Sequence, residues 1–331
     1  MKRIATLGLH HDHVWSNLHQ LQETGGAELV AAADEDEALL DKYRSELPGK
    51  TYASYEALLD EEDLDAVYLF GSNRLNEDLT VMACKRGLHC LVEKPMASTL
   101  AGAERMLAAA TGAGVRLMIN WPFAWWPQLR HGIAMAQAGE IGQLWQVKYR
   151  AAHQGPVELG CSAQFCEWLY DTELNGAGAL MDYCCYGAVL ADVLLGKPDS
   201  VSGTIISTGL KPDLQLEDNA ILVLSYPHAL ATTEASWTQI GSLTSYGTTL
   251  YGSKGTLVIE PDHEGKIILA TAEHPAGRIL EIPPQPDHLD NSATHFLAAI
   301  NDPGIEIHPL CDARHGLGAQ WILEEGIQST R

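Results

Sequence analysis

The chain has 331 residues, 46% of them hydrophobic, which is enough material for two domains with their own cores. Its formal net charge is −22 and no stretch is strongly basic, so nucleic acid and anionic membranes are poor candidate partners. It contains no run of 18 apolar residues, so no membrane span is expected, and early histidines interrupt what begins like a signal peptide.

The cysteines are odd in number, and their spacing matches no zinc or disulfide framework. Reduced thiols in a cytoplasmic protein are therefore expected. The seven positions are Cys84, Cys90, Cys161, Cys166, Cys184, Cys185 and Cys311.

Up to about residue 120, strand-like and helix-like segments alternate. This alternation predicts a parallel, doubly wound sheet whose strands all end on one edge, where such folds bind ligands. Ser98 is expected to cap the last helix of the series. Strands are predicted at 3–8, 27–34, 64–73, 88–95 and 115–121, and helices at 14–26, 35–47, 76–87 and 98–114.

The pattern changes after about residue 125. Two helix-like segments, 126–142 and 179–196, precede consecutive strands with short turns between 201 and 284, which are typical of an antiparallel sheet. Two more helices are predicted near 289–301 and 311–329. We therefore expect a doubly wound domain at 1–122 and an α+β domain at 123–331, with the cleft between them as the default site.

The first strand ends at Gly8, where a phosphate-binding turn would continue with glycines. Instead His10, His11, Asp12 and His13 follow. The strand, the glycine and the helix still predict backbone N–H groups near a pyrophosphate, with Asp12 as the helix cap. Since adjacent residues on a turn point in different directions, these four cannot easily surround one tetrahedral ion, and no metal site is predicted.

Asp34 ends the second predicted strand, where an acid accepts hydrogen bonds from the adenosine ribose of a dinucleotide. Glu35 follows, with no adjacent Arg or Lys. A 2′-phosphate would be repelled there, so NAD is favoured over NADP. The alternative is a solvated acid at a strand end.

Lys94 lies at the carboxyl end of another predicted strand, and Pro95 fixes the turn after it. Such a turn would direct the ammonium group into the ligand crevice. The alternative is a surface lysine before a helix-initiating proline.

Small residues at 176–179 allow a helix to start close to another backbone. Asp182 and Tyr186 then share one face of a mostly apolar helix, where buried polar groups need partners. The alternative is a surface pair without chemistry.

Together these features resemble the Gfo/Idh/MocA family of NAD(P)-dependent sugar and inositol oxidoreductases, over nearly the whole chain. The resemblance implies a Rossmann domain and a domain with a large, mostly antiparallel sheet, whose open face forms a homodimer or homotetramer. It rests on the first strand, glycine and helix, and on "VAAAD", "DAVYLFGSNRLNEDL", "GLHCLVEKPMA", "GEIGQLWQVKYR" and "GAGALMDYCCYG".

The resemblance also assigns roles. Lys94 matches the motif lysine that binds the reacting hydroxyl and the nicotinamide ribose, and Asp182 matches the aspartate that orients substrate. At the last position of the helix motif, Tyr186 matches the tyrosine of the glucose–fructose oxidoreductase and dihydrodiol dehydrogenase branch. Other members of the family have His at this position. Asn76 replaces a loop His and Cys184 a Gly. The implied cofactor contacts are Gly8, His10, His11, Asp34, Glu35, Gly71, Ser72, Asn73, Asn76, Glu93 and Lys94.

Oxidation of a secondary alcohol requires hydride transfer to nicotinamide and loss of a proton from oxygen. A free phenol is a poor base at neutral pH, but a neighbouring ammonium favours the phenolate. Lys94 and Tyr186 are therefore expected to act as an acid–base pair.

Aromatic side chains cluster just past the last strand of the first domain. Indole faces stack on the C–H-rich faces of sugar rings, although core packing is the alternative for each. The expected substrate contacts are Trp121, Trp126, His153 and Trp168.

The leading hypothesis is an NAD-dependent oxidoreductase that transfers a hydride between nicotinamide and a secondary alcohol of a sugar, polyol or inositol-like ring. Two alternatives remain open: glycoside cleavage through transient sugar oxidation, and a non-catalytic NAD or sugar sensor.

Overall fold

The computed structural model describes residues 1–330, which form two compact units. Each unit is assembled from separate stretches of chain. Unit 1 contains residues 1–120, 161–176 and 286–317, and unit 2 contains residues 121–160, 177–285 and the chain from Gly318 onward.

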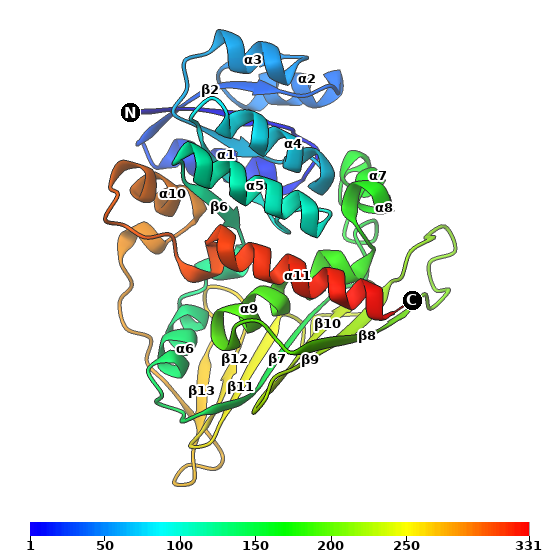
Figure 1. Ribbon diagram of the computed structural model, residues 1–331, viewed down its shortest axis with the longest axis vertical. Helices are drawn as coiled ribbons and strands as arrows, with labels where there is room; N and C mark the ends of the chain where they lie inside the picture. Colours follow the sequence, from blue (N-terminus) through cyan, green and yellow to red (C-terminus); the bar gives the residue numbers. More distant parts are fainter. Residues whose placement is uncertain (331) are drawn as a thin grey trace. The chain divides into compact units, whose positions relative to one another are not determined.

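Unit 1 is built on a six-stranded parallel sheet in the order β3-β2-β1-β4-β5-β6 (Figure 1). This confirms the doubly wound fold expected from the sequence. The strands are β1 (Lys2–Leu7), β2 (Ala27–Ala33), β3 (Lys50–Tyr52), β4 (Ala66–Leu69), β5 (His89–Glu93) and β6 (Leu117–Asn120).

Helices cover both faces of this sheet. The crossovers from β1 to β2 and from β4 to β5 run in opposite directions along the sheet, so right-handed connections place α1 and α4 on opposite faces (Figure 1). The α-helices that lie wholly within unit 1 are α1 (His13–Glu23), α2 (Glu37–Glu46), α3 (Tyr55–Glu61), α4 (Asn73–Cys84), α5 (Leu100–Ala113), α7 (Ala163–Leu169), α8 (Thr172–Asn175) and α10 (Ser292–Asn301).

The central strands are buried on both faces, as a parallel sheet between two helix layers requires. All four residues of β4 are buried. Side chains cap several of the helices, including Asp36 on α2, Ser72 on α4 and Thr99 on α5. The expectation that Ser98 caps α5 was wrong, because its hydroxyl instead donates to the buried Glu77 carboxylate over 2.8 Å.

The late segment 286–317 completes unit 1. Helix α10 packs against α1, and the Ser292 hydroxyl donates to Asn17 Oδ1 over 2.7 Å. Asp312 also forms an antiparallel bridge with Met118 of β6. The edge of the parallel sheet therefore depends on chain that lies far away in sequence.

Unit 2 is built on an eight-stranded sheet in the order β14-β13-β12-β11-β7-β10-β9-β8. β7 is parallel to β10, and the other neighbouring strands described in this sheet are antiparallel. The strands are β7 (Leu144–Ala152), β8 (Ser200–Ile206), β9 (Asn219–Ser225), β10 (Leu230–Ser236), β11 (Gly247–Gly252), β12 (Thr256–Ile259), β13 (Ile267–Ala270) and β14 (Arg278–Ile279).

Helices pack on one face of this sheet. These are α6 (Pro127–Gln137) against β12 and β13, and α9 (Cys185–Leu195) against β7 and β10. Burial alternates along β9: Leu222 and Leu224 are buried, whereas Ile221 and Val223 are exposed. The sheet therefore has one covered face and one open face. Helix α11 (Ala313–Ser329) ends the described chain.

Residues Thr172–Leu195 form helical segments long and apolar enough, by length and composition alone, to cross a membrane. Most of this stretch, 83% of its most apolar window, is buried within the protein. This burial accounts for the apolar composition of the stretch, as in a helix of a protein core.

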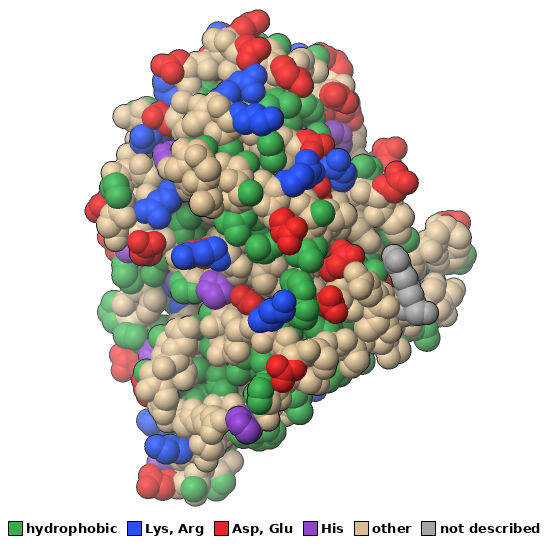
Figure 2. Space-filling view, viewed as in Figure 1, with side chains coloured by type: hydrophobic (Ala, Val, Ile, Leu, Met, Phe, Trp, Pro, Cys, Tyr) green, Lys and Arg blue, Asp and Glu red, His purple; other side chains and the backbone are tan. Residues whose placement is uncertain are grey.

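Charged side chains of unit 1 form ion pairs within α4 and between α4 and α5. Arg105 lies 3.0 Å from both Glu77 and Asp78, and Arg74 lies 3.0 Å from Glu77. Figure 2 shows basic and acidic side chains interspersed over one face of the protein.

Candidate functional site

Within unit 1, β1 and β4 approach each other closely at their carboxyl ends. Gly8 has φ +83°, and a Cβ at this position would lie 2.5 Å from the backbone nitrogen of Gly71. Glycine is therefore required at this position both by backbone conformation and by contact. The same sheet edge carries Asp34 after β2 and Lys94 after β5.

Asp34 is fully buried, and its carboxylate is already engaged. Oδ2 accepts a hydrogen bond from the Leu9 N–H over 2.6 Å, and Oδ1 accepts one from the Asp36 N–H over 2.8 Å. His10 Nδ1 lies 3.2 Å from Oδ2. Although burial opposes it, the Asp34 carboxylate raises the pKa of His10 above its usual 6.5. A ribose that bound Asp34 would have to displace this imidazole.

Several backbone N–H groups of the loop after Gly8 already donate hydrogen bonds to other atoms of unit 1. Besides Leu9, His11 donates to the Phe70 carbonyl over 2.9 Å, and His13 donates to His11 Nδ1 over 3.2 Å. Three backbone N–H groups of this loop are therefore already hydrogen-bonded within unit 1.

Asp12 precedes α1 but makes no capping bond to it. Its Oδ2 instead accepts the Ser162 N–H over 2.8 Å and so ties the loop to the start of α7. The capping role expected of Asp12 was therefore wrong.

His11 is buried beside aromatic rings, with Phe165 4.7 Å and Trp168 5.8 Å away between ring centroids. Burial lowers the pKa of His11 well below 6.5, and the charges of His13 and Lys94 act in the same direction. The ring is therefore a neutral imidazole at physiological pH.

The loop after β4 is held by amide side chains. Asn76 Oδ1 accepts the Gly71 N–H over 3.0 Å, and Asn73 Nδ2 donates to Asn175 Oδ1 over 2.8 Å. With Ser72 as the α4 cap, all three polar side chains predicted to contact cofactor are buried and support the loop.

Lys94 and Glu93 lie side by side in sequence at the end of β5, and both are buried. Glu93 Oε2 accepts a hydrogen bond from Asn120 Nδ2 over 2.8 Å, and its Oε1 lies 3.0 Å from His13 Nδ1. The peptide bond between Lys94 and Pro95 is cis. Glu35, the other acid predicted to contact cofactor, is exposed.

In unit 2, the glycine-rich stretch does bring a helix start against another backbone. A Cβ at Gly178 would lie 2.4 Å from the Glu217 carbonyl oxygen. Glu217 Oε1 accepts the N–H groups of Gly178 and Leu180, over 2.7 and 3.1 Å. Burial raises the pKa of Glu217 above its usual 4.5.

The helix that carries Asp182 and Tyr186 begins with a π-helical turn, η2 (Leu180–Cys184). Such turns are frequent at functional sites. Asp182 Oδ2 accepts the indole N–H of Trp237 over 3.0 Å. Cys184, where the family resemblance implies Gly, is fully buried with its sulfur 3.5 Å from the Thr233 carbonyl of β10.

Tyr186 is buried in a cluster of aromatic rings. Trp121 and Phe123 meet it edge-on at 5.5 and 5.0 Å, and Tyr149 stacks at 6.0 Å. Trp121 is fully buried. In this structure Trp121 therefore packs against Tyr186, in line with the core-packing alternative.

The other predicted substrate contacts are divided between the units. Trp168 belongs to unit 1, where its indole N–H donates to the His10 carbonyl over 3.4 Å. His153 and Trp126 belong to unit 2. His153 is buried against the Tyr183 ring at 4.8 Å, whereas Trp126 is partly exposed.

Two features of unit 2 were missed from the sequence. The hydroxyls of Tyr183 and Tyr246 are 2.8 Å apart, and burial raises the pKa of Tyr183 well above 10. Trp237 orients Asp182 from the end of β10. Tyr183 could have been noticed because it follows Asp182, whereas nothing in the sequence links Trp237 or Tyr246 to that helix.

Two family models match the chain. An oxidoreductase family model with an NAD-binding Rossmann fold matches residues 4–121, and a GFO/IDH/MocA C-terminal domain model matches residues 130–258.

Curated relatives carry names of sugar enzymes. D-xylose 1-dehydrogenase (NADP(+)) 2 of Haloferax volcanii is 34% identical over 182 residues, 55% of this chain and 54% of that protein. A dTDP-3,4-didehydro-2,6-dideoxy-alpha-D-glucose 3-reductase of Streptomyces antibioticus is 25% identical over 282 residues, 83% of this chain and 82% of that protein. The match thus spans about half the length of the first relative and most of the second.

Solved structures share the whole fold. The aldose-aldose oxidoreductase from Caulobacter crescentus superposes with a TM-score of 0.82 at 23% identity, covering 100% of this chain and 97% of that one. This similarity establishes that the architecture, with a parallel sheet and a large, mostly antiparallel sheet, is shared.

Proposed function

The chain belongs to the Gfo/Idh/MocA oxidoreductase family, and on this premise we propose that it transfers a hydride between a nicotinamide dinucleotide and a secondary alcohol of a sugar, polyol or inositol-like ring. The observation that carries the proposal is the buried Lys94 at the carboxyl end of β5, the sheet edge at which doubly wound folds bind ligands. The names of the curated relatives support a sugar-type substrate.

Unit 1 would hold the cofactor. The close approach of Gly8 and Gly71 suits a ligand lying over the strand ends, and Asp34 offers a carboxylate for ribose hydroxyls once His10 moves. Bound nicotinamide would supply the hydride acceptor. Lys94 would donate a hydrogen bond to the reacting oxygen and stabilise negative charge there.

Unit 2 would supply proton transfer and substrate orientation. Tyr186 would accept the hydroxyl proton as a phenolate during oxidation and, as the phenol, return a proton to the alkoxide oxygen during reduction. Its ring is fixed by Phe123 and Tyr149, so the phenol has little freedom to leave its position. Asp182, fixed by Trp237, would accept a hydrogen bond from a substrate hydroxyl.

The test is a panel of pentoses, hexoses, inositols and dihydrodiols with NAD and NADP, followed by absorbance of the reduced nicotinamide. Lys94→Ala should abolish turnover, and Tyr186→Phe should lower it about 10²- to 10⁴-fold. Tyr149→Phe is the matched control, since it removes a hydroxyl from the ring stacked on Tyr186 and should retain activity. Full activity in both site variants would refute the assignment.

Two other results would redirect the assignment. Dinucleotide binding without turnover of any alcohol would favour a sensor. Release of an aglycone without net NADH would favour glycoside cleavage through transient oxidation.

We propose NAD rather than NADP as the preferred cofactor. Glu35 and Asp36 follow Asp34 directly, so a 2′-phosphate would meet several carboxylates. The curated D-xylose enzyme is named for NADP(+), so the test must measure both. A higher kcat/KM with NADP than with NAD would contradict this proposal.

We propose that the open sheet face of unit 2 joins copies of this chain into a homodimer or homotetramer. Exposed apolar residues on this sheet, including Ile221, Val223 and Val258, support this, because a free surface would favour polar residues at these positions. The double variant Ile221→Lys/Val223→Lys should elute as a monomer in size-exclusion chromatography with light scattering. A wild-type monomer would contradict the proposal.

A further inference from the structure

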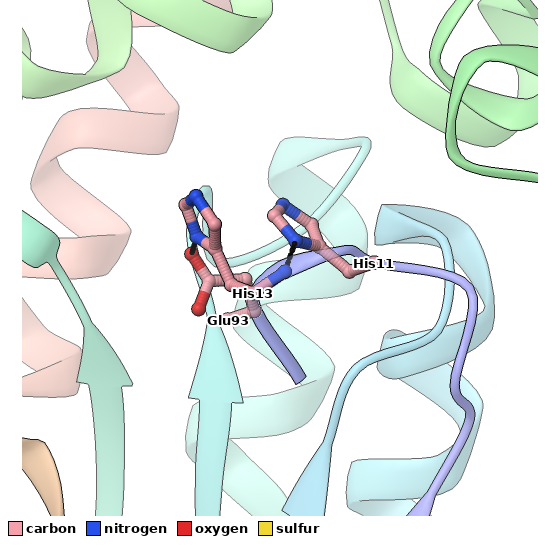
Figure 3. A group of neighbouring side chains, drawn as sticks. All are labelled: His11, His13 and Glu93. Carbon is pink, nitrogen blue, oxygen red and sulfur yellow. Dashed lines mark hydrogen bonds and ion pairs between the residues drawn. The ribbon is translucent and has the colours of Figure 1, made fainter. Parts of the chain in front are cut away.

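Three potential metal ligands gather at the carboxyl ends of β1 and β5 in unit 1. One ring nitrogen each of His11 and His13 and one carboxylate oxygen of Glu93 all lie within 4.8 Å of one another (Figure 3). The closest pair is His13 Nδ1 and Glu93 Oε1, 3.0 Å apart. The centroids of the two imidazole rings are 4.5 Å apart.

The carboxylate is held in place from behind. Glu93 is fully buried, and its Oε2 accepts the Asn120 amide N–H, which leaves Oε1 directed at His13 (Figure 3). Asn120 also donates to Asn17 Oδ1 over 3.1 Å, and Asn17 Nδ2 donates to the His13 carbonyl over 2.9 Å. Outer hydrogen bonds of this kind orient the ligands of metal sites.

The two imidazoles have complementary surroundings. His11 is buried and fixed edge-on by Phe165, so its ring is already ordered before any ion binds. His13 is at the start of α1, and its side chain is 43% exposed, which provides a path for an ion from solvent. An ordered ligand beside an accessible one suits an ion that exchanges with solution.

The two remaining polar side chains of the loop are used elsewhere. His10 faces Asp34, and Asp12 accepts the Ser162 N–H. No metal site was predicted from the sequence, because four consecutive residues cannot easily surround one ion. The structure combines two of them with a carboxylate that lies 80 residues away in the chain.

We propose that His11, His13 and Glu93 bind a divalent first-row transition-metal ion such as Zn²⁺ or Co²⁺. Two imidazole nitrogens and one carboxylate oxygen suit these ions, whereas Mg²⁺ and Ca²⁺ prefer oxygen ligands. Bonds of about 2.0–2.2 Å would draw the three side chains together, and a fourth position remains for water or another ligand. The proposal makes no use of the hydride transfer, although His11 and Glu93 are also expected to contact the cofactor.

The test uses the full chain, stripped of metal and free of dinucleotide and substrate. Co²⁺ is titrated while its visible absorption is followed, and Zn²⁺ is counted by elemental analysis after dialysis. We expect one ion per chain with the wild type. Affinity should fall at least tenfold in His13→Ala and in Glu93→Gln, because each variant removes one of three ligands.

The matched control is His19→Ala, which removes an exposed histidine from the same helix and should bind as the wild type does. Circular dichroism of each variant verifies folding, and the exposed position of His13 makes His13→Ala the safer of the two. Equal Co²⁺ affinity in the wild type and His13→Ala would overturn the proposal, as would an equal loss in His19→Ala. Since neither nucleotide nor turnover enters the measurement, its failure is distinct from failure of the proposed oxidoreductase function.

Discussion

The indole N–H of Trp237 donates to Oδ2 of Asp182 over 3.0 Å, joining the residue after β10 to the π-helical turn. A hydrogen bond to a charged group is worth about 1.5–3 kcal/mol. If Asp182 orients substrate, Trp237→Phe should lower kcat/KM about tenfold or more, because the carboxylate loses its fixed direction. Unchanged kcat/KM, in a variant that melts within a few degrees of the wild type, would show that this bond is dispensable.

Replacing His10 should relieve the cofactor loop. In His10→Gly the imidazole no longer lies beside Asp34 Oδ2, so a ribose hydroxyl can reach that oxygen. We expect NAD affinity equal to the wild type or up to about tenfold tighter, a gain of about 1.4 kcal/mol. The measurement is calorimetric titration with NAD. Complete loss of binding would instead identify the imidazole as a cofactor ligand.

Gly8→Ala should destabilise the protein more than an ordinary glycine substitution. Both a positive φ and a close contact with the Gly71 backbone oppose a Cβ there. We expect a loss of about 2–4 kcal/mol in urea unfolding. Gly87→Ala is the matched control, since Gly87 has φ +74° but a Cβ added to it would meet nothing within 4 Å, and it should lose about 1 kcal/mol. Equal losses in the two variants would contradict the close approach.

Glu217→Gln should change how stability depends on pH. Because burial raises the pKa of Glu217 above 4.5 in the folded chain, the unfolded chain releases this proton first as pH rises. The contribution of this group to stability is therefore fully present below about 4.5 and is lost as pH rises through the folded pKa.

Glutamine keeps the Oε1 acceptor for Gly178 and Leu180 but carries no titrating proton. Urea midpoints of Glu217→Gln should consequently fall less between pH 4.5 and neutrality than those of the wild type. Glu264→Gln, at an exposed loop position, should follow the wild-type profile. Parallel profiles for Glu217→Gln and the wild type would contradict the assignment.

Local patterns were enough to predict the parallel sheet and the mostly antiparallel sheet. The periodicity of apolar residues within a segment identifies it as a strand or a helix without knowledge of its neighbours. Asp34 and Lys94 could be placed at strand ends because each follows such a segment directly. The tight helix start at Gly178 followed from small residues alone.

Pairings between distant segments could not be predicted in this way. His10 lies against Asp34, and Glu93 lies against His13, because β2 and β5 end beside the loop, which only the sheet order determines. Asp12 failed as a cap because Ser162, 150 residues away, takes its carboxylate. The predicted boundary near residue 122 likewise marks where the chain first leaves unit 1. It does not show that segments 161–176 and 286–317 return to this unit.

That return affects the order of events during synthesis. Helix α10 covers α1, and Ser292 bonds to Asn17, yet segment 286–317 is synthesised long after α1. Domains generally fold as units while the chain emerges. Here the strands of the parallel sheet are synthesised well before segment 286–317, which completes the same unit, so a nascent chain that stops before this segment leaves the outer side of α1 uncovered.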